Sequence, residues 1–204
     1  MSTDLLLLFA DRVGVFVFAI SGGLLAVRKD MDLFGVVVLA FLPAVGGGTL
    51  RDLILDVPVF WLEDVAALAF AVAGGLAAFF AHPVLDRITK PLRLLDAAGM
   101  ALFATAGAAK TLALGLPIPI VLMMGAVTAC AGGLLRDVVA NEDPLLLKQD
   151  IYATAALLAA AVYAGLAITG ITGLAAYAGA ITAGFALRMI SLRRGWSLPR
   201  SPFR

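Results

Sequence analysis

The feature that most constrains the fold is a succession of seven apolar stretches, each about 20 residues long, the length that a helix needs to span the hydrocarbon core of a bilayer. Hydrophobic residues make up 62% of the 204-residue chain and charged residues only 14%. A soluble domain has about 45–50% apolar and about 25% charged residues. The pattern therefore predicts an all-α membrane protein. The seven predicted transmembrane helices cover residues 5–27, 33–50, 63–81, 95–114, 117–136, 150–169 and 172–190.

A motif that occurs twice divides these helices into two units. Gly46–Asp52 reads GGGTLRD and Ala131–Asp137 reads AGGLLRD, at an offset of 85 residues. Further identities occur at the same offset: Asp11 with Asp96, Gly14 with Gly99, Phe18 with Phe103, and Gly22 with Gly107.

Each unit holds three predicted helices, in residues 5–81 and 95–169. Because three is odd, the second unit must cross the membrane in the opposite sense, which predicts an inverted repeat. The seventh helix, 172–190, lies outside the repeat, and residues 191–204 form a basic tail.

The basic residues predict the orientation, because Lys and Arg concentrate on the cytoplasmic side of membrane proteins. With the N-terminus outside, twelve of the 15 basic residues fall at cytoplasmic ends, so we expect the N-terminus outside and the C-terminus in the cytoplasm. The twelve are Arg28, Lys29, Arg87, Lys90, Arg93, Arg136, Lys148, Arg188, Arg193, Arg194, Arg200 and Arg204; the remaining three are Arg12, Arg51 and Lys110.

The glycines of the motif fall in the central helix of each unit. Adjacent glycines weaken a helix by roughly 1 kcal/mol each relative to Ala, and broken helices at membrane depth are tolerated where they line a cavity. We therefore expect both central helices to be broken at a polar pathway between the units, with freed carbonyls and the Thr49 hydroxyl available to a cation. The alternative is that the small residues only let helices pack closely. The glycines concerned are Gly46, Gly47, Gly48, Gly132 and Gly133.

The pairs Arg51-Asp52 and Arg136-Asp137 follow the glycines within one turn. Neighbouring side chains diverge on a helix, so we expect each Arg to reach an Asp elsewhere and to close a neutral buried network that holds the pathway shut or sets its field. The alternative is that these are ordinary charges at a helix end.

Lys110 has Leu25 as its repeat equivalent, so this charge is peculiar to the second unit. It either snorkels to the interface or faces an aqueous path as a gate or voltage-sensitive charge. Asp96 is interpreted as a helix-start carboxylate, favoured by capping and the helix dipole, and Asp11 is given a weak role at the mouth.

Other classes of function are disfavoured. The single histidine, His82, and the single cysteine, Cys130, have no companions for a metal site or a catalytic group. The net charge of +1 provides no global field for nucleic acid. We expect no enzyme activity, no metal and no cofactor.

The doubled motif at fixed spacing, in two three-helix units followed by a seventh helix, resembles the prokaryotic TRIC (trimeric intracellular cation) channels, also labelled UPF0126 or glycine-transporter-domain repeat proteins. The resemblance covers about residues 5–190. It implies a homotrimer in the inner membrane, with a pore in each subunit for monovalent cations, chiefly K⁺ and also Na⁺, and with bound membrane lipids. The pore would run between the two units, past the central helices. The matching pore or gating positions are Gly46, Gly47, Gly48, Thr49, Arg51, Asp52, Lys110, Gly132, Gly133, Arg136 and Asp137.

Two alternatives to a channel remain. Inverted repeats also build carriers that work by alternating access, and opposed Arg and Asp charges suit the two ends of a small zwitterion such as glycine. A structural protein without transport is the third hypothesis.

Overall fold

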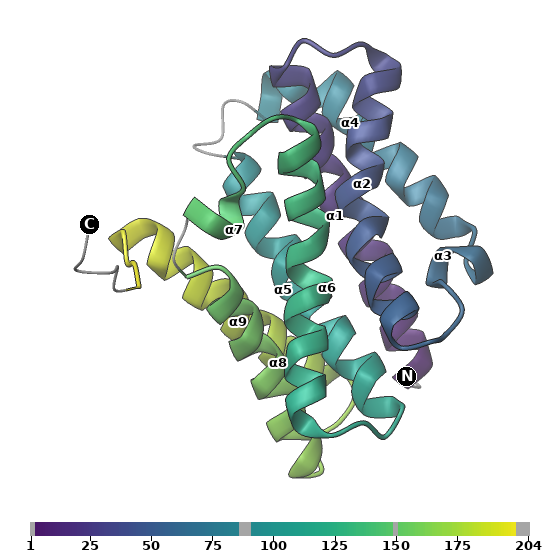
Figure 1. Cartoon of the computed structure of the whole chain (residues 1–204), viewed down its shortest axis with the longest axis vertical. Coiled ribbons are helices and arrows are strands. Elements are labelled where there is room, and N and C mark those ends of the chain that lie inside the picture. The colour runs from purple at the N-terminus through teal and green to yellow at the C-terminus, as the bar shows by residue number, and fades with distance from the viewer. Residues whose placement is uncertain (1–2, 86–90, 149–150, 199–204) are drawn as a thin grey trace.

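The computed structural model describes residues 3–85, 91–148 and 151–198, and over these ranges the regular elements are all helices. The order along the chain is α1 (Thr3–Arg28), α2 (Leu33–Ile54), α3 (Phe60–Glu63), α4 (Ala66–Leu85), α5 (Pro91–Ala113), α6 (Ile118–Val139), α7 (Leu145–Lys148), α8 (Ala153–Ile168) and α9 (Leu174–Arg194). Figure 1 shows the long helices side by side in a bundle, with α9 inclined across it.

Each of the seven predicted segments contains a long helix. Within the described ranges, six helices are long and apolar enough to cross a membrane, while the helix over Ala153–Ile168 has only 16 residues. The second predicted segment is longer than expected, because α2 continues to Ile54 and thus includes the motif's charged pair. Of the basic residues that predict the orientation, four lie outside the described residues, as does the end of the tail: Arg87, Lys90, Arg200 and Arg204.

The helices of residues 5–81 and 95–169 contact one another in the same pattern. In the first unit α1 contacts α2 and α4, and α2 contacts α4; in the second, α5 contacts α6 and α8, and α6 contacts α8. Between the units, equivalent helices meet, α1 with α5 and α2 with α6. Like-with-like contacts are the arrangement that a two-fold axis between two similar units produces.

The packing between α1 and α5 repeats this reciprocity at the level of single side chains. A Cβ on Gly14 would lie 2.5 Å from the ring of Phe103, and one on the equivalent Gly99 would lie 2.7 Å from the ring of Phe18. The two rings contact each other, with centroids 5.2 Å apart. Each glycine therefore makes room for the phenylalanine of the other unit, which explains why both residue types recur at the offset of 85.

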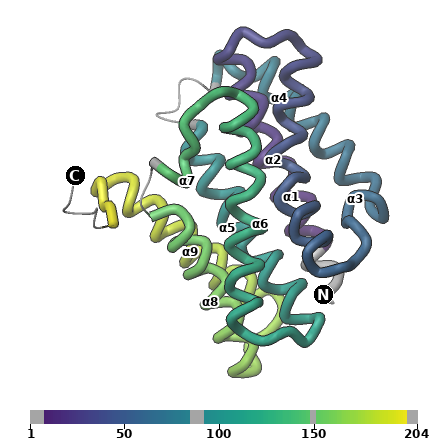
Figure 2. Tube along the Cα trace, in the orientation of Figure 1, coloured from purple at the N-terminus to yellow at the C-terminus, as the bar shows by residue number. Residues whose placement is uncertain are grey.

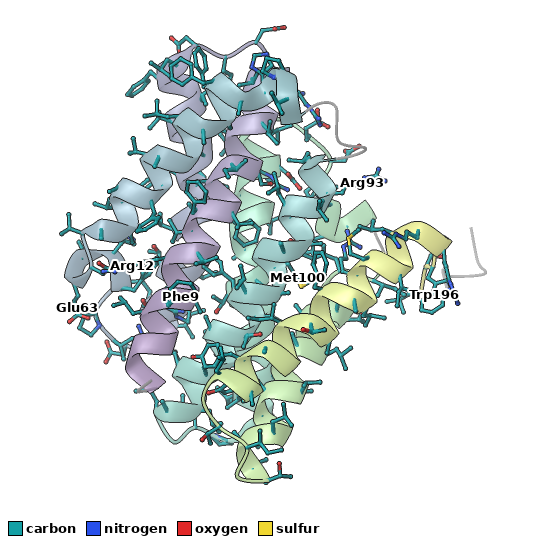
Figure 3. The ribbon with its side chains drawn as sticks, turned by 180° about the vertical axis from the view of Figure 1, so that it is seen from behind. Phe9, Arg12, Glu63, Arg93, Met100 and Trp196 are labelled. Atoms are coloured by element: carbon teal, nitrogen blue, oxygen red, sulfur yellow. The ribbon has the colours of Figure 1, made fainter. Side chains whose placement is uncertain are left out.

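Short helices follow α2 and α6 and lie on opposite sides of the bundle, α3 on one side and α7 on the other (Figure 2). Figure 3 shows Arg12 of α1 close to α3, the helix that carries Glu63. Arg12 donates to both carboxylate oxygens of Asp64, at 2.8 Å each, and so ties α1 to the connection between α3 and α4. The Arg12 guanidinium holds the pKa of the Asp64 carboxyl below its usual value.

α9 belongs to neither unit and packs on the second one, against α8 and α5. Tyr177 of α9 and Tyr163 of α8 meet edge to face, with ring centroids 5.2 Å apart. Small residues let the helices approach closely, as where Gly184 packs against Ala159 of α8. Aromatic and small-residue packing thus attaches α9 to the second unit.

Candidate functional site

The motif glycines do not break their helices. α2 is continuous from Leu33 to Ile54 and α6 from Ile118 to Val139, so the predicted broken central helices and freed carbonyls at Gly46–Gly48 are wrong. Glycine weakens an isolated helix, but burial in close packing outweighs propensity. The alternative interpretation, that small residues permit close helix packing, fits the contacts that these glycines make.

Gly47 and Gly132 form the point where α2 crosses α6, which we call the glycine crossing. A Cβ on Gly47 would collide with the carbonyl oxygen of Thr128, and one on Gly132 would lie 2.5 Å from the carbonyl oxygen of Pro43. Thr128 and Pro43 are themselves equivalent at the offset of 85. The crossing is therefore a reciprocal backbone contact between the two units, and neither position has space for a side chain.

The first charged pair of the motif lies one turn beyond the crossing, in a buried group of four charges that we call the first charge cluster: Asp11, Arg51, Asp52 and Lys110. Arg51 and Asp52 are fully buried. Arg51 donates from Nε and Nη2 to the two oxygens of Asp52, at 2.7 and 3.2 Å, and its Nη1 lies 3.4 Å from Oδ1 of Asp11. Lys110 Nζ donates to Asp52 Oδ1 at 2.8 Å. The cluster contains two cations and two carboxylates and is formally neutral.

Lys110 is the member that joins the two units, because it comes from α5 while the other three belong to α1 and α2. Its side chain is 19% exposed, whereas that of Asp52 is completely covered. Lys110 is thus neither a free interfacial lysine nor an isolated charge in a pore. Its ammonium group donates to the same oxygen, Asp52 Oδ1, that accepts from Arg51 Nε.

Asp52 also fixes the turn that follows α2. Its Oδ2 accepts a hydrogen bond from the backbone N–H of Phe60, at 2.9 Å, at the start of α3. In the second unit Asp137 Oδ2 accepts from the N–H of Leu145 at 2.8 Å, at the start of α7. Phe60 and Leu145 are separated by the same 85 residues. The aspartate of the motif therefore holds a helical hairpin, and the arginine neutralises it.

The second charge cluster consists of Asp96, Arg136 and Asp137, all buried. Arg136 Nε donates to Asp137 Oδ1 at 2.8 Å and its Nη1 to Asp96 Oδ1 at 2.9 Å. Arg136 Nη1 also donates to the hydroxyl of Ser21 in α1, which is the polar contact from this cluster to the first unit. This cluster has one guanidinium for two carboxylates.

The two clusters differ where the repeat is imperfect. A Cβ on Gly48 would lie 2.5 Å from the ring of Phe60, and that ring lies 5.6 Å from the Arg51 guanidinium. In the second unit Leu145 stands in place of Phe60. A Cβ on Gly133, the equivalent of Gly48, would instead lie 3.3 Å from the hydroxyl of Tyr152 and 3.4 Å from Asp96 Oδ1. The environment of the second cluster is therefore more polar.

Of the eleven residues predicted for the site, seven belong to the glycine crossing or to one of the two charge clusters, and the other four lie beside them in the motif: Gly46, Gly48, Thr49 and Gly133. Gly46 packs against Leu135, and the Thr49 hydroxyl donates to Val45 O and accepts from the Trp61 indole. Neighbouring Arg and Asp side chains were expected to diverge, which is wrong, since the long arginine side chain bends back onto the adjacent carboxylate in both units.

Sequence reasoning gave too little weight to three further members. Asp96 does not start a helix, because α5 begins five residues earlier at Pro91, and its carboxylate pairs with Arg136. Asp11 pairs with Arg51 in the first unit, as Asp96 pairs with Arg136 in the second. The signal was available, because Asp11 and Asp96 are equivalent at the offset of 85. Ser21 has Ala106 as its equivalent and gave no such signal.

The carboxylates of these clusters are each held by a guanidinium, and no group of three or more His, Cys, Asp or Glu suited to a metal ion occurs in the part of the chain that the structure describes. Buried charges at membrane depth are costly and mark ion or substrate pathways. The two charge clusters on either side of the crossing are therefore the candidate functional site of the chain.

Comparison with known proteins shows similarity to membrane proteins. The family described as "Glycine transporter" matches twice, over residues 8–83 and 93–168, which correspond to the two units. A UPF0126 membrane protein of Deinococcus radiodurans is 41% identical over 93% of this chain and 89% of its own length. The UPF0126 inner membrane protein YadS of Escherichia coli is 42% identical over 78% of each chain.

Solved structures extend the similarity to ion channels. The TRIC trimeric intracellular cation channel orthologue from Rhodobacter sphaeroides has a TM-score of 0.85 and 38% identity, over 93% of this chain and 98% of that one. A prokaryotic TRIC channel in 0.5 M KCl has a TM-score of 0.86 and 31% identity, over 95% of this chain and 99% of that one.

The fold and the buried clusters define an all-helical membrane protein of the channel and transporter class. More particularly, the chain belongs to the prokaryotic TRIC/UPF0126 family, which the match of both units, the relatives and the structures establish together.

Proposed function

We propose that this protein is a channel for monovalent cations, K⁺ and also Na⁺, with a pore in each subunit of a homotrimer. Similarity to TRIC cation channels over more than nine-tenths of the chain supports a cation channel. The observation that carries the pore's location is the complete burial of Arg51 and Arg136 at the interface between the two units. Charges at that depth are retained where a pathway needs them.

The pathway that we propose runs between the units, past the glycine crossing. Arg51 and Arg136 each follow the crossing glycine by four residues, about 6 Å along the helix axis. α2 and α6 run in opposite directions (Figure 2), so the clusters flank the crossing on its two sides. In this state the backbone contact of Gly47 with Thr128 closes the path, and opening requires α2 and α6 to separate or slide.

Lys110 is the proposed gate. Its ammonium group lies 2.8 Å from Asp52 Oδ1 and acts as a tethered cation on the oxygen that a permeating ion would use. Because its side chain is 19% exposed while its partner is covered, Lys110 stands between solvent and the cluster. A field or ion that draws Lys110 away would free the carboxylate.

The topology that we propose has seven spans, α8 included, with the units 5–81 and 95–169 inverted relative to each other, and 172–190 as the seventh helix before the basic tail 191–204. The N-terminus would lie outside and the C-terminus in the cytoplasm, in the inner membrane, with lipids at the trimer. The reciprocal contacts of α1 with α5 and of α2 with α6 support the inversion.

A carrier for a small zwitterion is the second candidate, favoured by the name of the matching family. The opposed charges of each cluster could bind an amino group and a carboxylate. In the structure, however, Arg51 and Arg136 are each paired with two carboxylates of the protein itself, so a zwitterion would have to compete with these ion pairs.

Single-channel recording of the purified protein in KCl and NaCl separates the candidates. Discrete unitary currents are expected; saturable glycine uptake without currents would establish a carrier, and neither would favour a structural protein. Arg51→Ala and Arg136→Ala should change conductance or opening frequency, and unchanged values in both would remove the clusters from the pathway.

The gate is tested by Lys110→Gln, which should raise the open probability and weaken its voltage dependence. Lys29→Gln is the matched control, because Lys29 is paired with Glu142 at the surface, with side chains 34% and 44% exposed. Equal effects of the two substitutions would contradict the role of Lys110.

A further inference from the structure

The second charge cluster contains more carboxylates than cations. Around Arg51 the repeat provides two cations and two carboxylates, whereas around Arg136 it provides one cation and the carboxylates of Asp96 and Asp137. The position equivalent to Lys110 is Leu25, so the repeat itself offers no second cation there. An uncompensated carboxylate buried in a membrane protein is strongly unfavourable, which directs attention to cations from outside the repeat.

Arg188 of α9 is such a cation. It is 2% exposed although it lies within a membrane-spanning helix. Its guanidinium lies 4.8 Å from the centre of the Tyr152 ring, and its Nη1 donates to the carbonyl oxygen of Ile151 at 3.2 Å. The side chain thus points into the protein, onto the Tyr152 ring.

Tyr152 connects Arg188 to that cluster. One face of its ring receives the guanidinium, while its hydroxyl lies 3.3 Å from the position that a Cβ on Gly133 would take, where Asp96 Oδ1 and Arg136 Nη2 also gather, at 3.4 and 3.8 Å. The absence of a side chain at Gly133 lets these groups converge. A continuous series of contacts therefore leads from Arg188 of α9, through Tyr152 just before α8, to the charged residues of α5 and α6.

We infer that Arg188 is the fourth charge of the second cluster and that α9, through it, sets the electrostatic barrier at that end of the pathway. The first unit obtains its second cation from the opposite unit, as Lys110, partly exposed and able to move. The second obtains it from α9, as a buried guanidinium stacked on an aromatic ring. In the proposed channel, the first cluster can therefore change when Lys110 moves away, whereas Arg188 keeps the second cluster neutral. This inference rests on the proposed channel function and assigns α9 a part in it.

The test compares ion selectivity of the full-length protein in planar bilayers. Arg188→Gln leaves a net negative charge in the second cluster, so the permeability ratio of K⁺ to Cl⁻, from reversal potentials in a KCl gradient, should rise several-fold. Arg188→Gln combined with Asp96→Asn restores neutrality and should return the ratio to the wild-type value. Arg193→Gln, an equal loss of charge at an exposed position of the same helix, is the matched control and should change nothing.

If Arg188→Gln alone does not yield folded protein, the double variant should recover a monodisperse oligomer, and Arg188→Lys should fold with wild-type selectivity. The inference is overturned if Arg188→Gln conducts with the wild-type ratio, if Asp96→Asn fails to compensate, or if Arg188→Lys behaves like Arg188→Gln. Wild-type protein without any unitary current would refute the proposed function itself, so the two failures are distinguishable.

Discussion

The glycine crossing gives the most direct prediction of stability. Gly47→Ala places a methyl group against the carbonyl oxygen of Thr128, a backbone atom that cannot turn away. Overpacking of this kind costs about 1–3 kcal/mol. Against this, alanine gains about 1 kcal/mol over glycine inside a helix. The net change for Gly47→Ala is therefore between near zero and a loss of about 2 kcal/mol.

Gly165→Ala isolates the packing contribution. Gly165 lies inside α8 and has no atom within 4 Å of the position that its Cβ would take. The same substitution there should gain about 1 kcal/mol from helix propensity alone. The two variants should thus differ by about 1–3 kcal/mol, which corresponds to roughly 2–12 °C in Tm for a chain of this size.

The assay is thermal unfolding of both variants in one detergent, followed by circular dichroism and by retention of the monodisperse oligomer. Gly132→Ala should resemble Gly47→Ala, because its methyl group would meet the carbonyl oxygen of Pro43. Equal Tm values for Gly47→Ala and Gly165→Ala would refute the backbone contact, and equal Tm values for Gly132→Ala and Gly165→Ala would refute its reciprocity.

Two further substitutions test the charged groups. Asp52→Asn removes a carboxylate that accepts hydrogen bonds from Arg51, Lys110 and the Phe60 N–H. The free energy of unfolding, measured by chemical or thermal unfolding, should therefore fall by about 3–5 kcal/mol. The control is Asp56→Asn, at an exposed position with φ of 52°, which should be neutral because asparagine tolerates that backbone conformation. Arg12→Gln should lower Tm by an amount that is constant from neutral pH to about pH 5 and disappears in acid. The reason is that the Asp64 carboxyl, whose pKa is lowered in the folded protein, stabilises the fold above its ordinary pKa of about 3.9 and loses this contribution as pH falls through the lowered value. A Tm difference that grows toward acid would contradict the Arg12–Asp64 pair.

The repeat was readable from the sequence because both units must meet the same packing demands. Gly14 and Gly99 make room for Phe103 and Phe18, so the glycine and the phenylalanine recur together. Apolar length located all the long helices for a similar reason, since the bilayer sets a minimum span. These features depend on constraints that act locally or repeat along the chain.

What could not be predicted depends on contacts between elements. Helix propensity at Gly46–Gly48 argued for a break, and only the proximity of α6 shows that the missing side chains permit a crossing. The partner of Asp96 lies 40 residues away in α6. Arg188 lies outside the repeat and so has no equivalent to draw attention to it, and its place among the basic residues at cytoplasmic ends did not predict that it is buried.

The motif's internal spacing explains why one short segment serves both packing and charge. Residues four apart share a helix face, so Gly47 and Arg51 form one face of α2, while Gly48 and Asp52 form the next. Gly47 brings α6 to the backbone, and Arg51 then lies one turn along the same interior face, where water and lipid are excluded.

The second face holds the hairpin. The Phe60 ring packs on Gly48, where a Cβ would collide with it, and the Phe60 N–H donates to Asp52, so this face of α2 contacts the start of α3 at two positions. Because Arg51 and Asp52 are consecutive, the guanidinium can bend from the first face to neutralise the carboxylate of the second. The Arg51–Asp52 pair therefore links the face of α2 that contacts α6 to the face that holds α3, and Lys110 of α5 donates to the same carboxylate.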